Sequence, residues 1–191
     1  MNSASASYSI VAGGISSHAA AGYSMAAGRR AKANHIGSFV WGDSVNADKA
    51  SSTNDEFNVY ASGGARFFSN SSATTGVILA PGGGSWTAVS DQNAKENFAS
   101  VDGRDVLERL MEIPISTWNY KSQDDGIRHM GPMAQDFWAA FELGLGDKSI
   151  ATIDPDGVAL AAIQGMYALF VERIAELEER LAKAEARLAS E

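Results

Sequence analysis

The sequence contains no cysteine and only 4 prolines among its 191 residues. Without cysteine the chain can form no disulfide, no thiolate nucleophile and no cysteine-based metal site. We find no uninterrupted apolar run of transmembrane length and therefore expect no membrane partner. Residues 1–9 lack the basic and apolar regions of a signal peptide, so Sec-dependent export of this chain is not expected.

Positive charge does not balance the acidic residues in the second half of the chain, and the formal net charge is -8. Residues 1–89 carry five Lys/Arg and four Asp/Glu, whereas the residues from Ser90 onward carry ten and nineteen. An acidic surface repels phosphate backbones, which excludes nucleic acid as a partner of this half. Asp154 and Asp156 lack the other ligands of a calcium loop, and we predict neither a metal nor a cofactor.

A short motif recurs near the N-terminus, in Tyr8–Gly13, Tyr23–Gly28 and Gly37–Gly42, with offsets of 15 and 14 residues. A fixed short period predicts the stacked turns of a solenoid, each with a short strand closed by a glycine corner. Three such repeats bury little surface, so we expect identical chains to pack against one another.

These repeats, over about residues 7–45, resemble the head repeats of trimeric autotransporter adhesins of the YadA type. The resemblance implies three left-handed β-rolls packed side by side, and the alternative is an unrelated Gly/Ala-rich β segment. We assign residues 1–50 to this head. Residues 51–89 hold further β-like runs, including Phe57–Tyr60, and a glycine-rich turn, and are assigned to a β connector and cleavage linker.

After Ser90 the apolar pattern changes. It predicts a short helix over Val106–Met111, strands over Ile115–Tyr120 and Ile150–Ile153, and a turn at Asp154–Gly157. A long helix follows from about Val158. The predicted fold class is therefore α+β: a trimeric β-roll or β-solenoid head, then a mixed α/β domain that ends in a long coiled-coil helix.

Residues 158–191 carry apolar side chains at alternating steps of three and four, which is typical of a coiled-coil seam. The chain offers no second long helix as a partner, so self-association is favoured over a helix folded back on its own domain. The spacing does not distinguish a dimer from a trimer, and the thin head repeats favour a homotrimer. The seam residues are Ile163, Tyr167, Phe170, Ile174, Leu177, Leu181 and Leu188.

Ser90 and Lys95 follow the glycine-rich connector and form a candidate chemical site. A neutral lysine amine can take the proton of a serine hydroxyl, whose oxygen then attacks a carbonyl carbon. Such a lysine needs a depressed pKa, which burial or a nearby positive charge provides. A serine and a lysine five residues apart are common, so this spacing alone carries little weight.

Ser90-Asp91 with Lys95-Glu96-Asn97 resembles the opening of the C-terminal chaperone of endosialidase-type phage tailspikes and tail fibres. The resemblance spans almost all of residues 90–188, and Pro132 departs from it at a position where the family more often has an aromatic residue. Further matching segments, in order, are Leu107 with Leu110, Trp118–Lys121, His129–Asp136, Ile153–Val158 and Ala161–Gln164.

The resemblance implies that Ser90 is the nucleophile, that Lys95 is its base and that the bond cut is Val89–Ser90, after trimerisation. Residues 90–157 would then be a chaperone and self-cleaving serine endopeptidase that acts once, on its own chain. Candidates for supporting the site are Asp91, Asn97, His129 and Gln135.

The expected function is an intramolecular chaperone that trimerises a fibre or spike protein and releases itself. The alternative is a non-cleaving trimerisation module of an adhesin or fibre tip. The expected partner is the chain itself, and the head is a candidate for binding a host-surface glycan or receptor. The expected location is a virion tail fibre or a bacterial cell surface.

Overall fold

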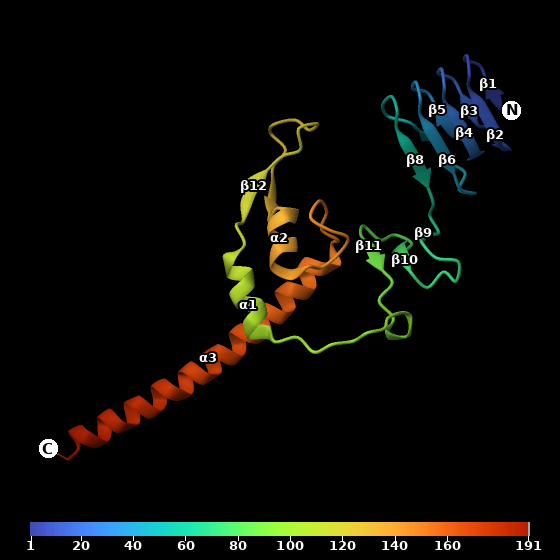
Figure 1. Cartoon of the computed structure of the whole chain (residues 1–191). Helices are drawn as coiled ribbons and strands as arrows, with labels where there is room; N and C mark the ends of the chain where they lie inside the picture. Colours follow the sequence, from blue (N-terminus) through green and yellow to red (C-terminus); the bar gives the residue numbers. More distant parts are fainter. Residues whose placement is uncertain (191) are drawn as a thin grey trace. The chain divides into compact units, whose positions relative to one another are not determined.

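The computed structural model describes residues 1–190, and the chain divides into a unit from Met1 to Asn97 and a second unit from Phe98 onward. Figure 1 shows strands in the first unit and mostly helix in the second. The predicted α+β class is confirmed, with a β-solenoid of about four turns, a small α/β region and a long C-terminal helix.

The solenoid consists of two four-stranded sheets of parallel strands, and successive strands of the chain belong to the two sheets in turn. One sheet has the order β2-β4-β6-β8, and the other has the order β1-β3-β5-β7. The first sheet contains β2 (Ile10–Ile15), β4 (Met25–Arg29), β6 (Phe39–Gly42) and β8 (Phe57–Tyr60). The second contains β1 (Ser3–Ala4), β3 (His18–Ala19), β5 (Ala31–Ala33) and β7 (Lys49–Ala50).

The register of the first sheet follows the sequence repeat, because Ile10 pairs with Met25 and Met25 pairs with Phe39. The structure adds a fourth rung in which Phe39 pairs with Phe57. The sequence pattern assigns Phe57–Tyr60 to the connector, whereas these residues form the last strand of the solenoid. The motif does not reveal this rung, because it is offset by 18 residues and lacks the closing glycine.

The solenoid interior is narrow and is filled by small side chains. Its largest fully buried residue is Val40, and the buried apolar residues are Ala19, Ala26, Ala31, Ala33 and Val40. One column of the first sheet needs glycine: a Cβ on Gly28 would lie 1.8 Å from the carbonyl oxygen of Gly42. The rungs therefore stack by backbone contact at this column.

The two sheets differ on their outward faces. The outward row of the first sheet is apolar and consists of Ile10, Met25, Phe39 and Phe57. The corresponding row of the second sheet is mostly polar and consists of Ser3, His18, Lys32 and Ala50. The solenoid thus keeps small residues inside and exposes large apolar residues on one face.

A three-stranded antiparallel sheet follows the solenoid within the first unit, with the order β11-β10-β9. It comprises β9 (Ala65–Phe68), β10 (Gly76–Leu79) and β11 (Trp86–Ala88). The N–H of Val89 donates to the carbonyl of Gly76 at 3.0 Å, so regular pairing continues to Val89 and stops before Ser90.

The second unit packs two short helices on the first part of a long one. Its elements are α1 (Gly103–Glu112), β12 (Ser116–Trp118), β13 (His129–Gly131), α2 (Ala134–Phe141) and α3 (Ile153–Leu188). The strands β12 and β13 pair antiparallel. The core contains Val106, Ile113, Phe137, Val158 and Ala162.

The crossing of α1 and α3 depends on two glycines that face each other. A Cβ on Gly165 would lie 2.1 Å from the carbonyl oxygen of Gly103, and a Cβ on Gly103 would lie 2.8 Å from the nitrogen of Gly165. Close backbone approach therefore fixes where α1 sits along α3.

The predicted strand over Ile150–Ile153 and the predicted turn at Asp154–Gly157 are both wrong. Residues 150–152 form no strand, and α3 begins at Ile153. Pro155 is tolerated because N–H groups in the first helical turn have no intrahelical partner. Asp154 and Asp156 favour this position because their charges complement the positive end of the helix dipole.

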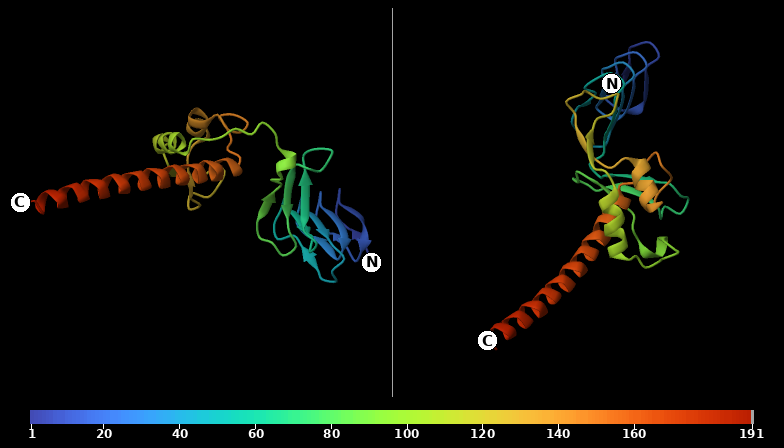
Figure 2. Two further views of the ribbon diagram at one scale, coloured as in Figure 1. Left: turned by 90° about the horizontal axis from the view of Figure 1, so that it is seen from below. Right: turned by 60° about the vertical axis from the view of Figure 1, so that its left-hand side comes forward.

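Helix α3 has 36 residues, and its buried residues are Val158, Ala162 and Gly165. In both views of Figure 2 its C-terminal part extends well beyond the other elements of its unit. One 18-residue window in α3 has a mean hydropathy of 1.4, which by length and composition alone is enough to cross a membrane. This window is not an uninterrupted apolar run, and a single helix of this kind is weak evidence for a membrane span.

Candidate functional site

Ser90 lies immediately after the β-sheet of the connector. Val89 is half-buried and is held by its hydrogen bond to Gly76, whereas Ser90 is exposed. The carbonyl group of the Val89–Ser90 peptide bond therefore belongs to Val89, which the sheet holds in place. The Ser90 hydroxyl belongs to the first residue after the sheet.

A single turn of 3-10 helix, η1 (Gln92–Ala94), separates Ser90 from Lys95. Asp91 is its N-cap, and the Oδ1 atom accepts from the backbone N–H of Asn93 at 2.9 Å. The backbone N–H of Lys95 donates to the carbonyl of Gln92 at 3.1 Å and closes the turn. The chain thereby folds back, and Lys95 Nζ donates to Ser90 Oγ at 2.6 Å.

The Ser90–Lys95 pair is open to solvent in the single chain, because both residues are exposed. A lysine becomes a good base when burial or a neighbouring positive charge disfavours its ammonium form. The single chain brings the two side chains together and leaves them in water, so burial of the pair requires a further surface.

His129 and Gln135 belong to the second unit, whereas Ser90 and Lys95 belong to the first. His129 Nε2 lies 3.0 Å from Gln123 Oε1, and the His129 ring lies against Trp118 at a tilt of 34°, with a centroid separation of 4.8 Å. These contacts give His129 a structural role in the β12–β13 pair. Its role at the cleavage site stays a prediction.

Gln135 is exposed on α2 and lines a cavity of about 710 Å³ between β12, β13 and the loop before α3. Asn97 adopts a left-handed backbone with φ 58° at the end of the first unit. Neither residue has a contact with Ser90 or Lys95 among the described hydrogen bonds. Their supporting roles therefore also stay predictions.

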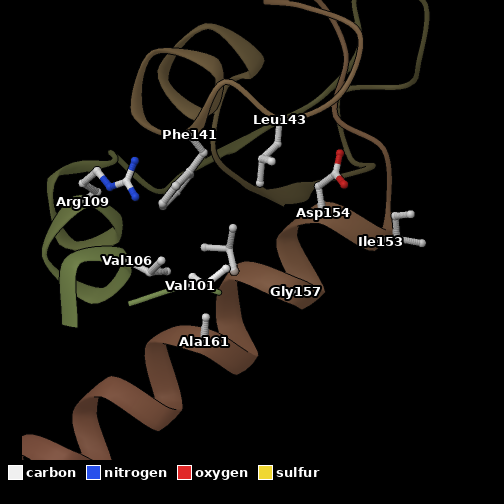
Figure 3. A pocket seen from close by; sticks show the side chains of 10 residues that line it. Val101, Val106, Arg109, Phe141, Leu143, Ile153, Asp154, Gly157 and Ala161 are labelled. Carbon is white, nitrogen blue, oxygen red and sulfur yellow. The ribbon is translucent and has the colours of Figure 1, made fainter. Parts of the chain in front are cut away.

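A second cavity, of about 380 Å³, lies between α1, the loop after α2 and the start of α3. Figure 3 shows Leu143 and Phe141 above this cavity and Ala161 below it, with Arg109 at one side and Asp154 at the other. The guanidinium of Arg109 lies 5.2 Å from the Phe141 ring centroid and donates to the carbonyl of Ala140. Within residues 1–190, no three His, Asp or Glu side chains come together to hold a metal ion.

The predicted seam residues are exposed along the whole of α3, with exposed fractions from 46% to 75%. These seven apolar side chains form one stripe along the helix, and no other element of the chain buries them. The stripe consists of Ile163, Tyr167, Phe170, Ile174, Leu177, Leu181 and Leu188.

Sequence reasoning named Asp91 as a supporting residue but missed what its side chain does. The available signal was local, since an aspartate is a favoured N-cap and the next residues form a short turn. The aromatic cluster of Trp118, Tyr120 and His129 was also missed, because its members are brought together by strand pairing.

The second half of the chain is similar to a known protein family. Residues 90–143 match a peptidase family described as the chaperone of endosialidase. The match begins at Ser90 and confirms the predicted C-terminal chaperone region. It does not reach residues 1–89, so the resemblance to adhesin head repeats stays a prediction. A search of curated proteins found no significant match.

Proposed function

Because the chain carries an endosialidase-type chaperone segment from Ser90 onward, we propose that it is an intramolecular chaperone that trimerises a fibre protein and then cuts itself off between Val89 and Ser90. The family supports a chaperone role for a fibre protein and points to association with phage tail fibres. Self-cleavage, the identity of the catalytic pair and release of the chaperone are parts of the proposal.

One observation carries the cleavage proposal: Lys95 Nζ lies 2.6 Å from Ser90 Oγ. Ser90 directly follows the half-buried Val89 in the chain. A neutral Lys95 amine would take the hydroxyl proton while Ser90 Oγ attacks the carbonyl carbon of Val89. Collapse of the tetrahedral species breaks the peptide C–N bond, and the Ser90 nitrogen takes up a proton. An ester between Val89 and Ser90 Oγ replaces the amide.

Water completes the reaction by attacking the ester carbonyl. The ester C–O bond breaks, leaving a carboxylate on Val89 and restoring the hydroxyl of Ser90, which now carries a free amino group. Water is the one external reactant of this scheme, and the step needs no oxidant or reductant. The products are residues 1–89 and residues 90–191.

Assembly would supply the burial that the single chain lacks. The exposed α3 seam favours a coiled coil of identical chains, and the apolar outward row of the solenoid favours packing of the heads against one another. A neighbouring chain that covered Lys95 would disfavour its ammonium form and so start the cut only after trimerisation. Removal of the chaperone would then make the assembled fibre kinetically stable.

Mass spectrometry of the freshly folded chain tests this proposal. We expect two fragments, one ending at Val89 and one beginning at Ser90. Ser90→Ala removes the nucleophile and Lys95→Ala removes the base, so each variant should stay intact and trimeric. The exposed residues Ser100 and Lys121 provide matched controls, and Ser100→Ala and Lys121→Ala should cut normally. Cutting that persists in Ser90→Ala would overturn the assignment of the nucleophile.

A second candidate function is a permanent trimerisation module, and the exposure of Lys95 in the single chain favours it. An intact wild-type trimer that shows one band on a gel would support this alternative. In either case the head could display a surface that binds a glycan or a receptor on a host. Direct binding of the assembled head to host cells would test that part separately.

A further inference from the structure

The Ser90–Lys95 contact requires the chain to reverse over a very short distance. An extended chain advances about 3.3 to 3.6 Å per residue, so five residues would separate the two positions by roughly 17 Å. The turn η1 shortens this path because a 3-10 helix rises only about 2 Å per residue. Lys95 then leaves the turn with an extended backbone, at φ -125° and ψ 156°.

This turn has little to stabilise it. None of its three residues is buried, and a single helical turn forms at a high entropic cost. Its two backbone hydrogen bonds run from Ala94 to Asp91 and from Lys95 to Gln92, each at 3.1 Å. Tertiary packing therefore does not explain why residues 91–95 hold this conformation.

The side chain of Asp91 provides the missing constraint. Its Oδ1 atom accepts from the backbone N–H of Asn93 at 2.9 Å and from the Asn93 side-chain amide at 3.0 Å. Among residues 90–97, Asp91 is the residue whose side chain binds the backbone of the turn. Loss of this cap would release the turn and let the Lys95 amine leave Ser90.

We propose that Asp91 is a positioning residue for self-cleavage, which holds the turn that aims Lys95 Nζ at Ser90 Oγ. This inference rests on the proposed function. The carboxylate acts through its geometry and not through its charge, because a negative charge near Lys95 would favour the ammonium form and oppose its role as a base.

Three variants at position 91 separate geometry from charge. Asp91→Ala removes both the cap and the charge, whereas Asp91→Ser and Asp91→Asn remove the charge and keep a favoured N-cap. We expect Asp91→Ala to lower the first-order rate constant of cutting by about 3- to 30-fold, the equivalent of losing one N-cap. Asp91→Ser and Asp91→Asn should restore most of the rate.

The dependence of the rate on pH gives a readout that a general loss of structure would not produce. Asp91→Ala and Asp91→Ser are both neutral at this position, so they should share the same apparent pKa for cutting. They should differ in the plateau of the rate at high pH. Rates are compared per assembled trimer, measured by light scattering on the same sample.

Asp102 offers a matched control, because its side chain caps α1 by accepting from Arg104 N at 2.9 Å. Asp102→Ala should leave the cutting rate per trimer unchanged. Wild-type rates in Asp91→Ala, or equally slow cutting in Asp91→Ala and Asp91→Ser, would overturn the positioning role and leave the proposed function intact. Absence of cutting in the wild type would instead refute the proposed function.

Discussion

The solenoid and the second unit, from Phe98 onward, fill their interiors in opposite ways. The second unit holds most of the residues that match the chaperone family and is called the chaperone unit below. The solenoid buries mostly alanine and serine, together with Val40 and Lys49, while Phe57 and Trp41 lie on its outer surface. The chaperone unit buries Phe137 and Ile113, as an ordinary globular core does. Yet both leave large apolar side chains exposed: Ile10 and Phe57 at the ends of the outward row of the first solenoid sheet, and the stripe on α3.

The reason for the exposure differs between the two units. In the solenoid the limit is the interior between the two sheets, where Val40 is the largest fully buried residue. In the chaperone unit the limit is length, because α1 and α2 cover only the first part of α3. Exposed apolar patches of this extent mark interaction surfaces. Two physically unrelated constraints thus both call for partner chains.

The largest expected effect comes from breaking the α3 stripe. Replacing Ile174 and Leu181 together by Asp would place two unpaired charges in the seam of each chain, and each would cost several kcal/mol if buried. We expect loss of the trimer in sedimentation and, as a consequence, loss of cutting. Ala175→Asp with Ala182→Asp is the matched control, since these exposed positions lie one residue beyond the stripe.

A monomeric Ile174→Asp/Leu181→Asp variant that cuts at the normal rate would show that the site does not need assembly. A variant that stays trimeric through its solenoid would show instead that the head carries more of the association than the helix does.

The next largest effect should come from the solenoid glycine column. Gly28→Ala places a Cβ 1.8 Å from the carbonyl oxygen of Gly42, and Gly28 has φ 86°, which disfavours any side chain. Overpacking together with this backbone strain should destabilise the head by about 3–5 kcal/mol. Denaturant unfolding followed by the fluorescence of Trp41 would measure it.

Gly63→Ala is the control for this experiment, because nothing lies within 4 Å of a Cβ at Gly63. If Gly28→Ala unfolded at the wild-type denaturant concentration, the rungs would have to be more widely spaced than described.

A smaller effect is expected from the corresponding glycine contact in the chaperone unit. Gly165→Ala would force α1 away from α3 and cost about 1–3 kcal/mol, partly offset by the better helix propensity of alanine. Gly157→Ala lies on the same helix with nothing within 4 Å of its Cβ and should be neutral or stabilising by up to about 1 kcal/mol. Thermal unfolding monitored by circular dichroism would compare them. Equal melting temperatures for the two variants would contradict the close α1–α3 approach.

The smallest expected effect concerns the acid sensitivity of the solenoid around Asp43. Hydrogen bonds from Ser62, and then from the backbone of Val45, lower the pKa of Asp43 below its ordinary value. The ion pair with Lys49 lowers this pKa further. A carboxyl group with a lowered folded-state pKa stabilises the fold above its unfolded pKa of about 4 and loses that contribution as the pH falls.

We therefore expect hydrogen-exchange protection at Val45 and Ser62 to weaken as the pH falls from about 5 to about 2. Asp43→Asn should show weaker protection near pH 7 and a flatter dependence on pH. Residues 76–79 of β10 provide an internal reference. If their hydrogen-exchange protection changed with pH as the protection of Ser62 does, a local role for Asp43 would be excluded.

Much of the architecture could be predicted from the residues alone. The repeat of Tyr8 and Tyr23 predicted the register of β2 and β4, because a parallel ladder pairs equivalent residues of successive turns. The apolar period after Val158 predicted α3, since one face of a helix recurs every three or four residues. The chaperone segment was recognised from short motifs that begin at Ser90.

The rest depended on contacts that no local pattern contains. Phe57–Tyr60 joined the solenoid because its backbone hydrogen bonds to β6, although its spacing and its missing glycine concealed the repeat. Asp154–Gly157 has the composition of a turn, yet the packing of Val158 against the core extends the helix through it.

The sequence by itself determined which residue types stand at the candidate site and that one face of the C-terminal helix is apolar. Only the tertiary structure decided that Lys95 meets Ser90, since the turn capped by Asp91 brings the two side chains within 2.6 Å. It also decided which face of the solenoid is apolar, because strand pairing aligns Phe39 with Phe57. Spacing in the sequence gives the number of residues between two side chains. The distance between them in space depends on which backbone hydrogen bonds form.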